Sequence, residues 1–252
     1  MLRIPAPGYL LWVALLFVHF NAEAQRKKNT FFFGGGYSLP IGKFASKALD
    51  DPKAGMAGSG VFGQVYYERA LLPGLGFRFT ASHNVNKTNP EQLIFQANYL
   101  AETWARFIGE TGVYSWTSDP GDWKQTSLMV GPTLSFPVGP IRIEVHAQAG
   151  RLFITSPHVI INGTSTSGNN PILAVMNPIK SECWGFSGGL SLAIPLGKVV
   201  QFNLFADAIG AEATFKDIAL RGTVGVLEAT HTISETRPVG IVNTGAGFAI
   251  RF

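Results

Sequence analysis

The sequence has little charge and almost no cysteine. Only 14% of its 252 residues are charged, where about a quarter is usual, and the formal net charge is +4. The one cysteine, Cys183, has no partner for an intramolecular disulfide. The charged residues form one cluster, Arg26 to Lys28. We interpret this cluster as a solvated terminus and expect no nucleic-acid partner.

Beyond its N-terminus the chain also lacks any apolar run long enough to span a membrane as a helix. The run Tyr9–Phe20 is about a dozen residues, whereas a spanning helix needs ~20. It follows Arg3, and small residues come after it at Ala22 and Ala24. This pattern predicts a signal peptide over 1–24, cleaved after Ala24, and a mature domain over 25–252. A retained N-terminal anchor is the alternative.

The chain is rich instead in glycine, phenylalanine and strict alternation. It holds 29 glycines and 19 phenylalanines, and its mean hydropathy is +0.18. From Ile141 to Ala149 every odd position is apolar and every even position is polar or charged. Val200–Asp207 alternates in the same way, broken only by Phe205. A period of two predicts strands with one apolar and one polar face.

Eight such segments can be placed, joined alternately by short turns and long loops. The predicted strands are Thr30–Ile41, Gly58–Ala70, Leu75–His83, Trp123–Phe136, Pro140–Ile154, Cys183–Ile194, Val199–Ala211 and Val239–Phe252. The short turns are Leu72–Gly74, Val138–Gly139 and Leu196–Lys198; the long loops are Gly42–Ala57, Asn84–Asp122, Thr155–Glu182 and Glu212–Pro238. Short turns on one side and long loops on the other are typical of transmembrane barrels, with the turns and both termini periplasmic.

The sequence therefore predicts an all-β, closed, antiparallel up-and-down transmembrane barrel of about eight strands. Closure is needed because an unpaired sheet edge in hydrocarbon costs several kcal/mol for each backbone group. A hairpin from 158–161 and 223–226 would raise the count to ten, although these segments are better interpreted as extensions above the membrane. A secreted β-sandwich is the soluble alternative.

Three stretches resemble a known family. Phe31–Gly42, Gly121–Gly139 and the terminal Arg251-Phe252 look like those of the outer-membrane β-barrel ("porin family") proteins of Gram-negative bacteria, Bacteroidetes type. The resemblance implies residence in the outer membrane, in contact with its lipid. It also implies that the barrel-assembly machinery reads the last strand, which ends in Phe252.

Seven charged or titratable residues fall on the polar, inward face of the predicted strands. They are Glu68, Arg78, Arg142, Glu144, His146, Asp207 and Arg251. Because an isolated buried ion is costly, these groups must pair, and we interpret them as a structural network that fills a narrow lumen. A narrow, gated polar path is the functional alternative, although eight strands usually leave no permanent channel.

No catalytic, cofactor or metal site is predicted. The histidines at 83, 146, 158 and 231 have no second ligand at a recognisable spacing. The first hypothesis is a non-enzymatic barrel with a filled lumen and a structural or surface-interaction role through its outer loops. The alternatives are a porin-like passage for small solutes and a lipid-modifying enzyme.

Two further features concern the loops and the membrane interfaces. Helical spacing after Asn89-Pro90 predicts a helix in the second long loop, reaching about Ile108. Aromatic residues near strand ends predict girdles at both interfaces. These aromatic residues are Phe31, Phe33, Tyr66, Tyr67, Trp116, Trp123, Trp184 and Phe252.

Overall fold

The computed structural model describes residues 28–48, 51, 53–91, 93–95, 98, 114–165 and 170–252. The predicted signal peptide over 1–24 and its cleavage site lie outside the described residues. Within the described part of the chain, no helix is long and apolar enough to cross a membrane.

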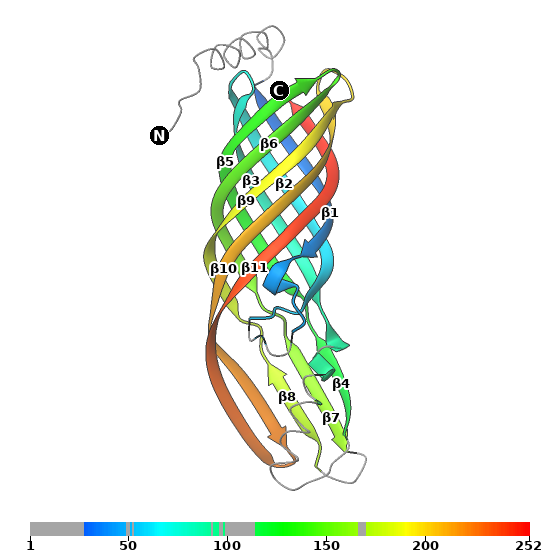
Figure 1. Ribbon diagram of the computed structural model, residues 1–252, viewed down its shortest axis with the longest axis vertical. Helices are drawn as coiled ribbons and strands as arrows, with labels where there is room; N and C mark the ends of the chain where they lie inside the picture. Colours follow the sequence, from blue (N-terminus) through cyan, green and yellow to red (C-terminus); the bar gives the residue numbers. More distant parts are fainter. Residues whose placement is uncertain are drawn as a thin grey trace, which may run out of the picture.

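Eight antiparallel strands close into a ring (Figure 1). In ring order they are β1 (Asn29–Pro40), β2 (Ala57–Leu72), β3 (Leu75–Thr88), β5 (Trp123–Val138), β6 (Ile141–Thr155), β9 (Lys180–Pro195), β10 (Val200–Val224) and β11 (Leu227–Arg251). The ring is closed because β11 pairs with β1 on one side and with β10 on the other. The predicted eight-stranded, up-and-down barrel is confirmed.

The two ends of the ring differ as the turn lengths predict. At one end, which we call the turn end, short turns with left-handed glycines connect the strands, such as Gly74 with φ 76° and Gly139 with φ 60°. The first and last strands of the ring meet there, since the Asn29 amide donates to the Phe252 carbonyl oxygen at 3.0 Å. We call the opposite end, where the long connections lie, the loop end.

The long connections at the loop end are largely built of strands, which corrects the predicted loops. β4 (Tyr114–Pro120), β7 (Val159–Ser165) and β8 (Ile172–Met176) continue the sheet outward from β10 in the order β8, β7, β4. β10 and β11 are 25 residues long and form one hairpin. The predicted loop 212–238 is therefore wrong. Because none of the added strands enters the ring, the ring count stays at eight.

We call β4, β7, β8 and the outer parts of β10 and β11 the outer extension; it projects beyond the ring (Figure 1).

The predicted helix in the second loop is only partly covered by the structure. Pro90, Glu91, 93–95 and Asn98 are helical, and the remainder of the predicted span to Ile108 lies outside the described residues. β3 also runs on to Thr88, five residues beyond its predicted end.

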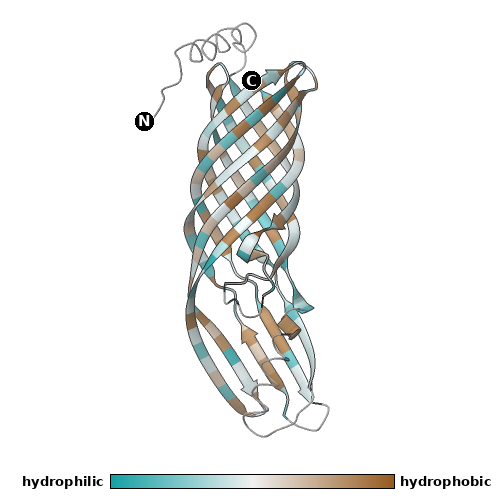
Figure 2. Cartoon of the chain, viewed as in Figure 1, coloured by the Kyte–Doolittle hydropathy of each residue, from teal (hydrophilic) through white to brown (hydrophobic). Residues whose placement is uncertain are grey.

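Polar and apolar residues alternate along the ring strands (Figure 2), and the apolar side chains of most strands point outward. Examples of exposed outward side chains are Phe33, Val65, Phe79, Val130, Val145, Phe186, Leu204 and Phe248. Nearer the loop end, the first charged outward residues are Lys87, Lys124, Arg151, Glu182 and Glu212. The ring thus carries an apolar band without Asp, Glu, Lys or Arg, and this band has the outward chemistry of a membrane-spanning barrel.

Candidate functional site in the barrel lumen

The alternation of each strand determines which side chains enter the lumen. On β6 the even-numbered residues point inward, so Arg142, Glu144 and His146 line the lumen while Ile143 and Val145 face outward. The same rule places Glu68, Arg78, Asp207 and Arg251 inward on their strands. Six of these seven residues meet in one connected cluster, which we call the ionic layer; Arg251 lies apart from it.

Arg78 is the centre of the ionic layer. Its guanidinium donates to Glu68 through Nε at 2.8 Å and to Glu144 through Nη2 at 2.6 Å. Nη1 lies 3.3 Å from Nδ1 of His146. The Arg78 side chain is only 2% exposed, so both carboxylates act as desolvated partners of a buried cation. Glu68 is also the direct cross-strand partner of Arg78.

Glu144 connects this centre to a second arginine. Its Oε1 accepts from Nε of Arg142 at 2.9 Å, and its Oε2 also accepts from Ser191 at 3.1 Å. Arg142 in turn donates to Oε1 of Gln201 at 3.0 Å. Each oxygen of the Glu144 carboxylate therefore has donors, as a buried charge requires.

His146 and Asp207 form the side of the ionic layer that faces the middle of the barrel. Nε2 of His146 lies 3.3 Å from Oδ1 of Asp207, whose Oδ2 accepts from Gln64 at 3.1 Å. The cavity beside them has a volume of about 10 Å³, which is roughly the space for one water molecule. His146 and Asp207 are both buried, and the lumen at this level is closely filled.

Arg251 is the one predicted member outside the cluster. It is half-buried at the turn end of β11 and makes no ion pair with any residue that the structure describes. Together the seven residues comprise three carboxylates, three guanidiniums and one histidine. The predicted set is thus close to electrically balanced.

Aromatic and amide side chains complete the filling, and sequence reasoning did not assign them to the lumen. The Arg78 guanidinium lies 3.9 Å from the centroid of the Tyr66 ring, which stacks on Phe32 at 4.6 Å. Tyr66 Oη accepts from Asn203 at 2.8 Å, and Asn84 donates to Asn243 at 2.6 Å. The inward parity of these positions was the available signal. The girdle prediction is wrong for Tyr66, which is buried.

At the loop end the lumen is filled by apolar side chains, which we call the apolar layer. Its largest members are Phe44, Trp123, Met129, Leu152, Ile154, Phe215 and Ile241. The Trp123 ring meets Phe215 at 5.8 Å. Trp123 is only 4% exposed, so the girdle prediction is also wrong there. Trp116 lies on β4 in the outer extension, beyond the ring.

The first long connection folds back and caps this layer, so the predicted loop Gly42–Ala57 is partly buried. A short 3-10 helix, η2 (Gly42–Phe44), places the Phe44 ring edge-on against Trp123 at 5.2 Å. The indole Nε1 of Trp123 donates to the Gly55 carbonyl at 3.0 Å. We call the described residues from Gly42 to Met56 the plug. On its exposed side, a hydrogen bond from Lys43 lowers the pKa of the Asp51 carboxyl.

The described residues contain no group of three or more His, Cys, Asp or Glu placed to hold a metal ion. His83 lies on the outer wall, where Nδ1 is 2.9 Å from Thr126 Oγ1. His158 follows β6 and His231 lies on the outer part of β11. The four histidines are therefore spread over separate places.

No protein-family model and no curated protein matches the sequence. Solved structures are similar at low identity. Neisserial surface protein A is 9% identical, with 89% of this chain and 97% of that chain covered at a TM-score of 0.45. The attachment invasion locus protein Ail of Yersinia pestis is 10% identical, covering 88% and 98% at 0.41. The outer membrane protein OprG of Pseudomonas aeruginosa is 12% identical, covering 90% and 97% at 0.42. The description of this chain as a closed barrel comes from its own strand pairing.

Proposed function

We propose that the chain is an exported outer-membrane barrel with a closed lumen that acts through its outer extension on a partner outside the cell. The observation that carries this proposal is the double closure of the lumen. The ionic layer around Arg78 fills one half and the apolar layer beneath the plug fills the other. A barrel so filled does its work on its surface.

The outer extension offers the features that a contact surface needs. Among the described residues, β4 pairs only with β7, and the outer part of β11 pairs only with β10, so two sheet edges are free. Free edges bind partner strands through backbone hydrogen bonds. The hairpin tip is apolar and exposed, with Val226 99% and Leu227 74% accessible.

Export and assembly complete the proposal. Residues 1–24 act as the cleaved signal peptide, and the barrel-assembly machinery recognises β11, whose last residue is followed by Phe252. The Phe252 side chain is 57% exposed, so its aromatic ring is available for recognition. No catalytic role is proposed, because the His146–Asp207 pair is sealed inside the lumen.

The first test is conductance of the purified protein in planar lipid bilayers. A closed lumen predicts no stable open level. Stable channels would instead support the passage of small solutes and overturn the proposal. Lipid A from cells with and without the protein is compared by mass spectrometry, and a change in its acylation or phosphate content would favour a lipid-modifying enzyme.

The second test shortens the hairpin of the outer extension. Residues 219–232 are replaced by Asn-Gly, which joins Ile218 to its cross-strand partner Ile233 through a two-residue turn and keeps Phe215 of the apolar layer. The barrel should still assemble, because the ring pairs are retained. Adhesion of expressing cells to surfaces or to each other should fall to the level of cells without the protein. Unchanged adhesion would refute a role for this hairpin.

A further inference from the structure

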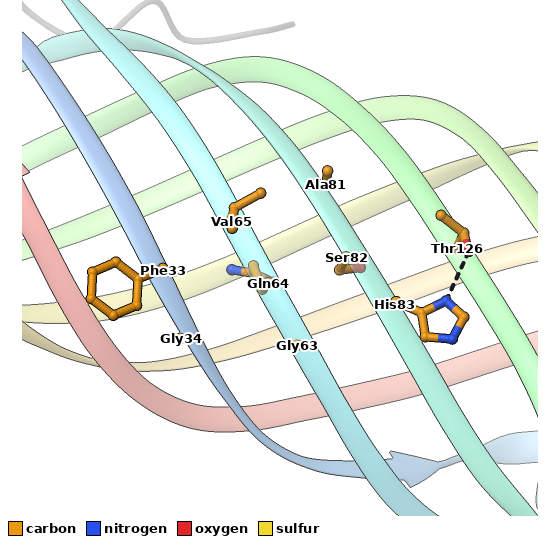
Figure 3. A pocket seen from close by; sticks show the side chains of 9 residues that line it. All are labelled: Phe33, Gly34, Gly63, Gln64, Val65, Ala81, Ser82, His83 and Thr126. Atoms are coloured by element: carbon orange, nitrogen blue, oxygen red, sulfur yellow. Dashed lines mark hydrogen bonds between the residues drawn. The ribbon is translucent and has the colours of Figure 1, made fainter.

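A depression of about 520 Å³ lies on the outer wall of the ring, across β1, β2, β3 and β5 (Figure 3). The outward side chains around it are Phe33, Val65, Ala81, His83 and Thr126. Gly63 lies among them and adds no side chain. A Cβ atom built on Gly63 would have no neighbour within 4 Å, so this glycine leaves open space.

The depression lies within the apolar band, which determines the class of its occupant. Gly63 pairs with Gly35 on one side and with His83 on the other, and His83 pairs with Thr126. These residues form one row across the wall. Because hydrocarbon surrounds this row in a membrane-inserted barrel, its natural occupant is a lipid acyl chain.

The row is inclined to the membrane plane. Thr126 lies 12 residues from Val138 at the turn end of β5. Gly35 lies only 6 residues from Asn29 at the turn end of β1. The row therefore runs from near the loop end at β5 to the middle of the apolar band at β1, as expected from strand tilt. An acyl chain lying in it would have its head group near the loop ends of β3 and β5.

Two lysines lie where that head group would be. Lys124 on β5 is the cross-strand partner of Val85, and Lys87 is the next outward residue on β3, so the two lysines are diagonal neighbours. Both are exposed, and neither makes an ion pair with a residue that the structure describes. Asp122, which precedes β5, is the acid nearest to Lys124 in the sequence and makes no ion pair with it. Ammonium groups at a membrane interface bind phosphate oxygens.

We propose that this depression binds one phosphate-bearing lipid of the outer leaflet. Its acyl chain lies over Gly63, beside the cross-strand pair of Phe33 and Val65, and its phosphate contacts Lys87 and Lys124. The His83–Thr126 hydrogen bond lies between the two parts, at the level of the lipid's polar linkage. The site rests on membrane insertion as proposed above but not on the role of the outer extension.

The test measures lipid retention by native mass spectrometry of the mature protein in detergent, with bisphosphorylated lipid A as the probe. Gly63→Leu fills the depression and should weaken retention about tenfold. The matched control is Gly210→Leu, since Gly210 is also exposed on the outer wall and a Cβ there meets nothing within 4 Å. This control should retain lipid A as the wild type does.

The head-group contact is tested with Lys87→Gln combined with Lys124→Gln. This variant should lose the preference for lipid A over its dephosphorylated form while still holding the acyl chain. Gel mobility of unheated samples shows that each variant is a folded barrel. Equal retention by wild type and Gly63→Leu, or equal loss in Gly210→Leu, would overturn the site. Failure of the wild type to insert into vesicles would instead overturn the proposed function.

Discussion

The half of the barrel near the turn end buries the ionic layer with a small aromatic cluster, whereas the half near the loop end buries the larger apolar layer. β10 passes through both. Near the turn end it buries Asn203, 1% exposed, and exposes Leu204, 42% exposed. Further along it buries Phe215, 2% exposed, and directs Lys216 outward. The solvent around each half explains the reversal, because hydrocarbon accepts apolar side chains and water accepts polar ones.

The inward positions of one continuous strand can therefore hold polar side chains in one part and apolar side chains in another. Within the band the charges of the ionic layer find their partners inside the lumen, with Arg78 at the centre. Beyond the band the interior is a normal hydrophobic core, which stabilises by removing apolar surface from water. Closure of the lumen therefore has two independent physical origins. Variants that affect one half should leave the other intact.

The largest effect is expected in the ionic layer. Arg78→Met removes the cation that neutralises Glu68 and Glu144, leaving two buried carboxylates without their central partner. The free energy of unfolding should fall by about 3–5 kcal/mol. Urea titration of the refolded barrel in detergent micelles, followed by circular dichroism, measures it.

A compensated variant is the control for this change. Adding Glu68→Gln and Glu144→Gln to Arg78→Met removes the unpaired charges and should restore most of the lost stability. If Arg78→Met alone were as stable as the wild type, the ionic layer would not be a desolvated network. The contrast with the apolar layer would then be lost.

The next effect locates the boundary between the halves on the outer face of β10. Leu204→Arg places a charge within the apolar band and should cost about 2–4 kcal/mol, whereas Glu212→Arg lies at its edge and should cost roughly 0–1 kcal/mol. Unfolding in lipid vesicles measures both. Similar costs for the two arginines would show that the surface around Leu204 is not in hydrocarbon.

The sequence predicts the ring well because strand alternation and turn length are local signals. In the segment from Ile141 to Ala149 the alternation itself shows which residues share a face. Short turns such as 72–74 identify the turn end. The inward charges could also be identified, since parity alone decides their face. Their actual partners, such as Arg78 with Glu144 over 66 residues, depend on the ring closing and are not in any local pattern.

The outer half was harder to predict for a physical reason. Beyond the apolar band the apolar face of each strand points into the barrel. The same alternation of apolar and polar residues there predicts the opposite orientation of the side chains. Phe215 and Trp123 are read as interface or loop residues unless the position of the boundary is known. The position of the plug also depends on contacts between distant parts of the sequence. Phe44 belongs to no periodic pattern, and it is buried only because the folded barrel brings Trp123 against it.

The smallest effect is expected at the plug, where the apolar layer can be opened without breaking the ring. Phe44→Ala removes the one buried aromatic side chain of the plug and should lower its docking free energy by about 1.5–3 kcal/mol. Hydrogen exchange at the Gly55 amide, which donates to the Lys43 carbonyl at 2.9 Å, should then accelerate about 10- to 150-fold. The exposed Lys47→Ala is the matched control and should leave exchange unchanged. Phe44→Ala should still show no conductance, because the ionic layer closes the lumen below it. Stable channels in Phe44→Ala would mean that the apolar half alone seals the barrel, and the two closures would reduce to one.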